Sequence, residues 1–350
     1  MSTESESAYA ILGQEVPLGS VDKALKELWG QDDARTKASL LNFAIYSEKA
    51  ESMEENTRLL EEITLEQACR GLLILAVPGE KRSARAWITA HCQLQDGHKS
   101  VCSEQVSFLL EQGNANQVRN VVFAHLDSDL PLACWWQDNL TSNFDERLYS
   151  VIDVLFIDSS KWSNPSADFT TLLNALSHDS VRFAVYDLSW LRSHLFRTAL
   201  AACFQDVVAL AELPKLNRIE IYYSKGNRLS ALLLVAWIGV RMKCGLDMAG
   251  KDIRLQSPEG ILINVSLVET TGAEHLQKII LRSKAATFTV TRECGAHYVC
   301  SRVEIGDHIY EEMLPADSVS DVALIVDQLS RMGGQSLYFQ MVPMLQKMIG

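Results

Sequence analysis

Two short apolar runs constrain the fold of this chain more than any other feature of its sequence. They cover residues 71–77 and 151–157, and each has the length of a strand rather than of a helix. Such runs are typical of strands buried on both faces, as in parallel sheets covered by helices. Strand-like and helical segments alternate around them from residue 20 to residue 245, and this alternation predicts an α/β domain with a largely parallel sheet.

The pattern changes after Gly245. Short breaks separate five strand-like segments, which predict an antiparallel β-meander over residues 252–257, 260–269, 275–283, 285–293 and 297–304. Two helical patterns follow, over residues 320–332 and 336–349, the second weakened by Pro343. We therefore predict three regions: a flexible acidic tail (1–19), an α/β domain (20–245) and a C-terminal antiparallel β-rich, α+β domain that ends in helices (250–350).

The charge balance argues against a nucleic-acid partner. The net charge is −12, whereas binding to phosphates needs clustered Lys and Arg. The longest apolar run, Ala231–Val240, is far shorter than the ~20 residues that cross a bilayer, so no membrane span is expected. The first thirty residues show no basic segment followed by an apolar one, and a cytoplasmic location is therefore expected.

The eight cysteines include no Cys-x-x-Cys pair, which argues against a zinc ribbon or a thioredoxin-like motif. In a reducing compartment we expect most of them to be buried thiols. The alternative is a redox pair, for which Cys294 and Cys300 are best placed, across a predicted hairpin. The sequence also lacks the glycine-rich nucleotide motifs and the standard hydrolase motifs, so we expect no cofactor, no metal and no catalytic residues.

Three polar or aromatic clusters remain as candidate sites. Trp136 follows Trp135 on a predicted strand, and adjacent side chains point to opposite faces, so one can fill the core while the other needs a cover such as a helix or a partner. Packing of both tryptophans in the core is the alternative. Asp158 and Ser159 follow the strand that ends at Ile157, where ligands bind in open parallel sheets; turn and cap chemistry is the alternative.

The third cluster precedes a predicted helix over residues 228–243. Lys225 and Asn227 lie in a glycine-containing loop there, and a helix N-terminus attracts anions. A glycine turn with Asn227 as the helix cap explains the same residues without any ligand. The helix itself is apolar on almost every side, which predicts that it is buried at the centre of a domain.

In their order along the chain, these clusters resemble the glucose-6-phosphate dehydrogenase assembly protein (OpcA) family. The resemblance rests on the following residues: Asp129-Leu-Pro with Trp135-Trp136, Asp158-Ser with Pro165 and Asp168, Asp187-Leu-Ser-Trp190 with Arg192, Tyr223, Gly226-Asn227, Ala231-Leu-Leu-Leu, Trp237, Ala38-Ser-Leu-Leu-Asn-Phe and Cys69-Arg70. It covers residues 36–245 well and the remainder more loosely. It implies a non-catalytic protein that binds glucose-6-phosphate dehydrogenase and promotes its active oligomer or conformation in the oxidative pentose phosphate pathway.

An α/β enzyme or sensor that handles a sugar phosphate or a nucleotide is the alternative function. For the partner surface, interfaces concentrate their binding energy in Trp, Tyr and Arg side chains. The candidate contacts are Trp136, Asp158, Ser159, Asp187, Trp190, Arg192, Lys225 and Asn227. The alternative for three of them is internal: Trp190 beneath the helix 191–204, and Asp187 paired with Arg192.

Overall fold

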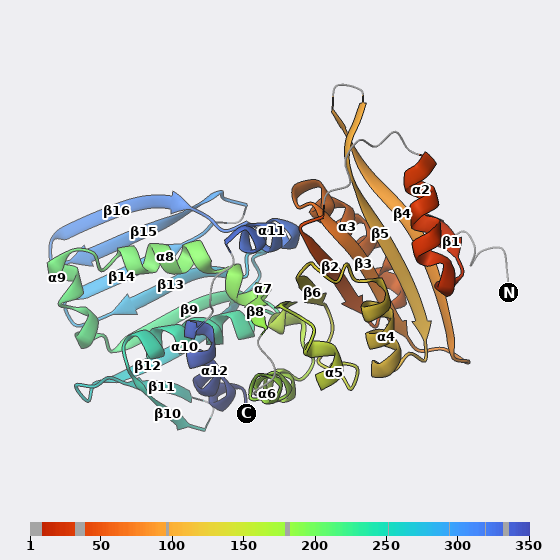
Figure 1. Ribbon diagram of the computed structural model, residues 1–350. Helices are drawn as coiled ribbons and strands as arrows, with labels where there is room; N and C mark the ends of the chain where they lie inside the picture. Colours follow the sequence, from red (N-terminus) through yellow and green to blue (C-terminus); the bar gives the residue numbers. More distant parts are fainter. Residues whose placement is uncertain are drawn as a thin grey trace. The chain divides into compact units, whose positions relative to one another are not determined.

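Two eight-stranded sheets organise the chain in the computed structural model (Figure 1). The structure describes residues 9–31, 39–95, 98–178, 183–250, 252–293, 295–318, 320–331 and 336–350. The chain divides into two compact units. The first comprises residues 1–163, 170–186 and 325–332, and the second comprises residues 164–169, 187–324 and 333–350.

The sheet of the first unit contains a central run of parallel strands. Its order is β1 (Gln14–Val16), β4 (Ser83–Gln95), β5 (His98–Glu111), β3 (Cys69–Val77), β2 (Leu41–Ser47), β6 (Leu132–Trp136), β7 (Val154–Ile157) and β8 (Ala184–Asp187). β5, β3, β2, β6 and β7 pair in parallel register. If β2, β3, β5, β6, β7 and β8 are numbered from one to six, their order is 3-2-1-4-5-6, which is that of doubly wound dinucleotide-binding domains.

The apolar runs form the core of this unit, as predicted. β7 is buried along its whole length, and every residue of β3 after Arg70 is buried. The helices of the unit are η1 (Ala10–Leu12), η2 (Leu18–Ser20), α2 (Val21–Gln31), η3 (Ala50–Ser52), α3 (Met53–Glu66), α4 (Ala115–His125), α5 (Glu146–Tyr149) and η4 (Ser159–Lys161). α3 packs closely on β3, since a Cβ on Gly71 would lie 2.9 Å from the Leu60 side chain.

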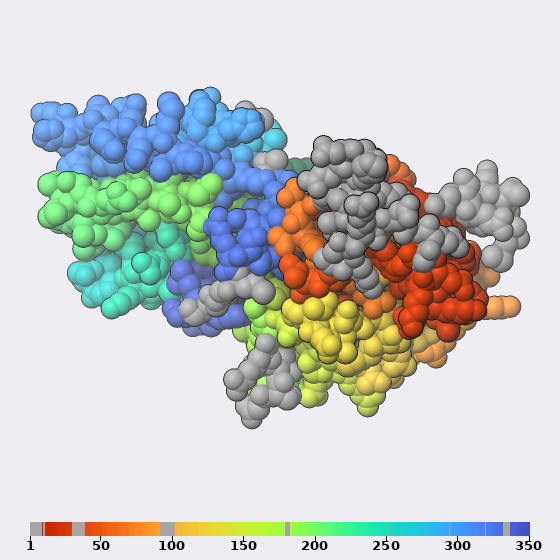
Figure 2. Space-filling model, turned by 45° about the horizontal axis from the view of Figure 1, so that its top comes forward, coloured from red at the N-terminus to blue at the C-terminus, as the bar shows by residue number. Residues whose placement is uncertain are grey.

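The sheet of the second unit is antiparallel except where β12 pairs with β9. Its order is β10 (Gly245–Ala249), β11 (Asp252–Gln256), β12 (Leu262–Thr270), β9 (Arg218–Ser224), β13 (Leu276–Arg282), β14 (Ala286–Thr291), β15 (Tyr298–Ile305) and β16 (His308–Pro315). Its helices are α7 (Leu188–Leu191), α8 (His194–Ala202), α9 (Val207–Leu210), η5 (Leu213–Lys215), α10 (Arg228–Arg241) and α12 (Ser336–Ile349). α6 (Pro165–Leu176) and α11 (Asp321–Arg331) contribute to both units. The α8–α9 segment lies beside β15 and β16 on the surface (Figure 2).

The fold class is confirmed, but the domain boundaries differ from the prediction. β9 lies between β12 and β13 in the second sheet, so the second unit begins near Asp187 rather than near residue 250. Within the tail predicted over residues 1–19, the described residues include regular structure: η1 and β1, which pairs with β4 through Gln14–Val16. The helix predicted over 191–204 is divided into α7 and α8.

Candidate functional site at the centre of the parallel sheet

The first unit has a small pocket where the parallel sheet changes winding direction. β2 and β6 are neighbours there, and the chains that leave them diverge, which opens a crevice at the carboxyl ends of the strands. The pocket has a volume of about 180 Å³. Its lining comes from the ends of β2 and β6 and from the segments that follow β2, β6 and β7: Ser47, Lys49, Glu51, Ser52, Glu55, Asn56, Trp135, Gln137, Asp138, Asp158 and Lys161.

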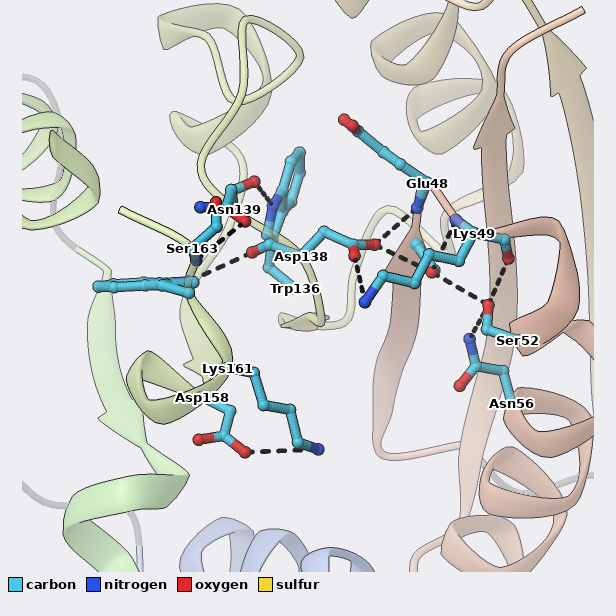
Figure 3. A network of polar contacts seen from close by, with 12 residues as sticks. Glu48, Lys49, Ser52, Asn56, Trp136, Asp138, Asn139, Asp158, Lys161 and Ser163 are labelled. Carbon is cyan, nitrogen blue, oxygen red and sulfur yellow. Dashed lines mark hydrogen bonds and ion pairs between the residues drawn. The ribbon is translucent and has the colours of Figure 1, made fainter. Parts of the chain in front are cut away.

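The carboxylate of Asp138 closes the loop that follows β2 (Figure 3). Its Oδ2 accepts hydrogen bonds from the Ser47 hydroxyl (3.0 Å) and from the backbone N–H of Glu48 (2.7 Å). Its Oδ1 lies 3.2 Å from the Lys49 ammonium. One carboxylate thus accepts hydrogen bonds from a side chain and a backbone donor of this loop and pairs with its lysine.

Further side chains fix the same loop from the start of α3. The Ser52 hydroxyl lies 3.0 Å from the Ser47 Oγ, which also accepts a hydrogen bond from the backbone N–H of Lys49. The Asn56 amide donates to the Ser52 Oγ at 3.1 Å. The polar atoms of this loop therefore bond to one another, as Figure 3 shows.

Trp136 belongs to the core behind this loop. It is fully buried, and its ring stacks on Tyr46 with a centroid distance of 3.7 Å. Its Nε1 donates to the Asn139 carbonyl (2.9 Å), while the Tyr46 hydroxyl donates to Glu48 (2.7 Å). Burial, and then the negative charge of Glu48, raise the pKa of Tyr46, which keeps the hydroxyl as a donor. Trp135 is also buried, so both tryptophans pack in the interior.

Asp158 and Ser159 form the turn after β7. Asp158 is the N-cap of η4, and its Oδ1 accepts from the backbone N–H of Ser160 (3.3 Å) and the Ser160 hydroxyl (2.6 Å). Its Oδ2 lies 3.4 Å from the Lys161 ammonium (Figure 3). Ser159 is fully buried. These contacts are the turn and cap chemistry that the sequence offered as the alternative, although Asp158 also lines the pocket.

In the second unit, Asp187 and Arg192 make internal contacts. Asp187 caps α7 through Ser189 (3.0 Å) and accepts a hydrogen bond from the Tyr338 hydroxyl at 2.8 Å. Arg192 forms an ion pair with Asp321, with an Nε–Oδ1 distance of 3.2 Å. Both side chains are nearly buried. A direct pair between Asp187 and Arg192 stays a prediction.

Trp190 packs beneath α8, as one of the two alternatives predicted. It is 4% exposed, and the Arg197 guanidinium of α8 lies 3.2 Å from the centroid of its ring. Desolvation lowers the pKa of Arg197 to about 9. This burial leaves little of the Trp190 side chain for a partner.

Lys225 and Asn227 lie in the loop between β9 and α10. Lys225 is exposed, and Gly226 has a φ of +84°, which favours glycine. Asn227 holds the N-cap position, but its side chain makes no cap hydrogen bond and instead donates to the Ser224 hydroxyl (2.8 Å). The glycine turn and the position of Asn227 as the helix cap are therefore confirmed, although the Asn227 side chain makes no cap hydrogen bond. Contact of any of the eight candidate residues with a partner stays a prediction.

The described cysteines are mostly buried thiols, as predicted. Cys69, Cys134, Cys203 and Cys244 are free and buried, and Cys300 is free and partly buried. Cys102 differs from the prediction, because it is disulfide-bonded. Cys294, one member of the predicted redox pair, lies outside the described residues. No group of three or more metal-ligating side chains is found within the described ranges, and no described helix is long and apolar enough to cross a membrane.

We expect these thiols to make the protein sensitive to alkaline pH. Burial raises the pKa of Cys69, Cys134 and Cys203 from 9.0 to about 12. The folded-state pKa lies above the unfolded one, so this stabilisation is complete below pH ~9 and is lost as the pH rises toward ~12. The urea midpoint, followed by tryptophan fluorescence, should fall across this range. A variant with all three cysteines changed to alanine should lose less, and an equal loss in both proteins would contradict the assignment.

Comparison with known proteins identifies relatives along most of the chain. Residues 60–174 match the family model described as "Glucose-6-phosphate dehydrogenase subunit N-terminal domain", and residues 183–342 match the corresponding C-terminal domain. The OpcA protein of Nostoc punctiforme, named for the OxPP cycle, is 26% identical over 190 residues, which span 53% of this chain and 40% of the relative. The OpcA protein of Synechocystis sp., also named for that cycle, is 22% identical over 88% of this chain and 69% of its own length.

A solved structure shares the fold. It is a mutant of KijD10, a 3-ketoreductase from Actinomadura kijaniata, in complex with TDP-benzene and NADP. It is similar with a TM-score of 0.51 and 9% identity, over 88% of this chain and 95% of that protein. At this identity the likeness concerns the fold alone. The fold raises the question of whether a dinucleotide fits the crevice between β2 and β6.

The residues of this crevice do not fit a dinucleotide. The loop after β2, Ser47-Glu-Lys-Ala-Glu-Ser52, contains no glycine, whereas a pyrophosphate needs glycines for close approach to the backbone. The Glu48 N–H already bonds to the Asp138 carboxylate. The lining carries four carboxylates and two ammonium groups, and its volume of about 180 Å³ is below the ~300–1,000 Å³ of small-molecule sites. The four carboxylates, the small volume and the occupied Glu48 N–H therefore each disfavour binding of a pyrophosphate in this crevice.

Proposed function

The chain belongs to the glucose-6-phosphate dehydrogenase assembly protein (OpcA) family, and we propose that it binds glucose-6-phosphate dehydrogenase and promotes the active oligomer or active conformation of that enzyme. The observation that carries this proposal is the match of both family domains, which together extend from residue 60 to residue 342 with a short gap. We assign this role to the oxidative pentose phosphate pathway, because the OpcA proteins of Nostoc punctiforme and Synechocystis sp. are named for the OxPP cycle.

We propose further that this chain catalyses no reaction of its own. Its support is the crevice between β2 and β6, where Asp138 bonds to the backbone donor that a cofactor phosphate would need. An activator without chemistry of its own acts by differential affinity, because it binds the active state of the enzyme more tightly than the inactive state. Coupling energies of this kind are about 1–3 kcal/mol, which corresponds to roughly 5- to 150-fold changes in an equilibrium.

We expect titration of the purified chain into glucose-6-phosphate dehydrogenase from the same organism to raise the activity or the melting temperature of the enzyme. The effect should saturate, and its factor should lie within the roughly 5- to 150-fold range of allosteric coupling. The chain alone, with glucose 6-phosphate and NADP, serves as the control and should show no turnover. If neither the kinetics nor the melting temperature of the enzyme changes, the proposal is wrong. Turnover of a sugar phosphate or a nucleotide by the chain alone would favour the enzyme alternative.

A further inference from the structure

The second unit contains a large groove between its helical layer and the edge of its sheet. It has a volume of about 690 Å³, within the ~300–1,000 Å³ of known binding sites. One wall comes from the end of α8 and from α9, and the other from the β15–β16 hairpin. Figure 2 shows these two segments side by side on the surface, in green and blue.

The groove lies on the helix-covered face of the sheet, between the helical layer and β16. Phe288 of β14 contacts Phe204, just after α8, with a ring distance of 4.3 Å. Val303 of β15 is the register partner of both Phe288 and Tyr310. Directly paired residues share a face, so Tyr310 points to the same side as Phe288. Phe288 is fully buried, whereas Tyr310 is 61% exposed.

Large apolar side chains from both walls are exposed in this groove. Val208 on α9 and Tyr310 on β16 are each 61% exposed. Isolated exposed apolar residues are ordinary, but two that face one groove from opposite walls indicate an interaction site.

The charge of the groove indicates the chemistry of its occupant. Its lining includes the carboxylates of Asp206 and Glu312, and neither Lys nor Arg is among the lining residues. Asp206 is held in place because its Oδ1 accepts from the backbone N–H of Val208 at 2.8 Å. An occupant that buries the apolar walls therefore gains by placing basic side chains beside these two carboxylates.

We propose that the groove binds an amphipathic helix of glucose-6-phosphate dehydrogenase whose apolar face is flanked by Lys or Arg. This inference rests on the proposed function. A helix placed beside α8 continues the layer that already covers β14 and β15, and it buries Tyr310 and Val208 together. Docking of an amphipathic helix in an apolar groove is a recurring mode of peptide recognition.

The test compares the affinity of single variants of the full chain for the dehydrogenase. Val208→Glu and Tyr310→Glu place charge on the apolar walls and should weaken binding by about tenfold or more. Glu312→Lys should also weaken it, and binding of the unmodified chain should weaken with salt. Leu262→Glu is the matched control. Leu262 is 39% exposed on β12, does not line the groove, and its variant should bind within about twofold of the unmodified chain.

Melting temperatures distinguish a variant that has lost its contact with the enzyme from a variant that has not folded. Val208 and Tyr310 are mostly exposed, so both variants should melt like the unmodified chain. If the unmodified chain binds the enzyme and these variants bind equally well, the groove inference is wrong while the proposed function stands. If the unmodified chain does not bind at all, both fail. If the unmodified chain dimerises and Val208→Glu makes it monomeric, the groove holds a second copy and the inference is overturned.

Discussion

Trp136→Ala should destabilise the first unit more than any other single change argued from this structure. The Trp136 side chain is fully buried, stacks on Tyr46 and meets Phe144 edge-on at 5.2 Å. Removal of a buried aromatic ring loses its burial and leaves a cavity, at a cost of about 3–5 kcal/mol in the free energy of unfolding. The melting temperature should therefore fall by roughly 10 °C, since each kcal/mol shifts a unit of this size by about 2–4 °C.

The matched control is Trp136→Phe, which keeps an aromatic ring against Tyr46 but loses the hydrogen bond to the Asn139 carbonyl. It should cost clearly less than the alanine variant, because most of the apolar contact remains. Circular dichroism melts of the three proteins measure the difference. If Trp136→Ala melts within about 2 °C of the unmodified chain yet no longer activates the dehydrogenase, the residue acts at an interface, and its assignment to the core is wrong.

The buried strands could be predicted from sequence because burial on both faces restricts composition. β3 and β7 consist almost wholly of apolar side chains, and α10 is apolar on nearly every side with ten buried residues. The edge strands β1, β10 and β16 were not predicted. An edge strand joins its sheet by backbone hydrogen bonds, which do not depend on the side chains. β16 (His-Ile-Tyr-Glu-Glu-Met-Leu-Pro) has no alternation to indicate a strand.

The domain boundary could not be read from local sequence either. β9 has the pattern of one more strand in the α/β alternation, yet it pairs with β12 and β13 in the second sheet. The choice of sheet depends on partners 46 to 64 residues later in the chain, and β9 itself carries no signal of that choice. The candidate site, too, could be predicted from the sequence only in part. Trp136 and Asp158 stand out in the sequence, but Asp138 does not, because its partner Ser47 lies 91 residues away.

Asp138→Ala should destabilise the same unit by about 3 kcal/mol, since hydrogen bonds to charged groups contribute about 1.5–3 kcal/mol each and their donors lose their partner. The donors are the Ser47 hydroxyl and the Glu48 N–H, and both bond to Oδ2. Asp138→Asn is the matched control. Its single amide oxygen can serve both donors, and the lost ion pair with the exposed Lys49 contributes little. The asparagine variant should therefore retain most of the stability, as urea unfolding would show.

Asp138→Ala also tests whether the whole loop after β2, rather than Asp138 alone, closes the crevice to a dinucleotide. Removal of the carboxylate frees the Glu48 N–H, yet the loop still has no glycine, and Glu51 and Glu55 still line the pocket. We therefore expect neither Asp138→Ala nor the unmodified chain to bind NADPH, measured by the fluorescence of the reduced nicotinamide and by calorimetry. Saturable binding by the unmodified chain would contradict the closed crevice. Binding by Asp138→Ala alone would show that the Asp138 carboxylate, and not the whole loop after β2, prevents nucleotide binding in this crevice.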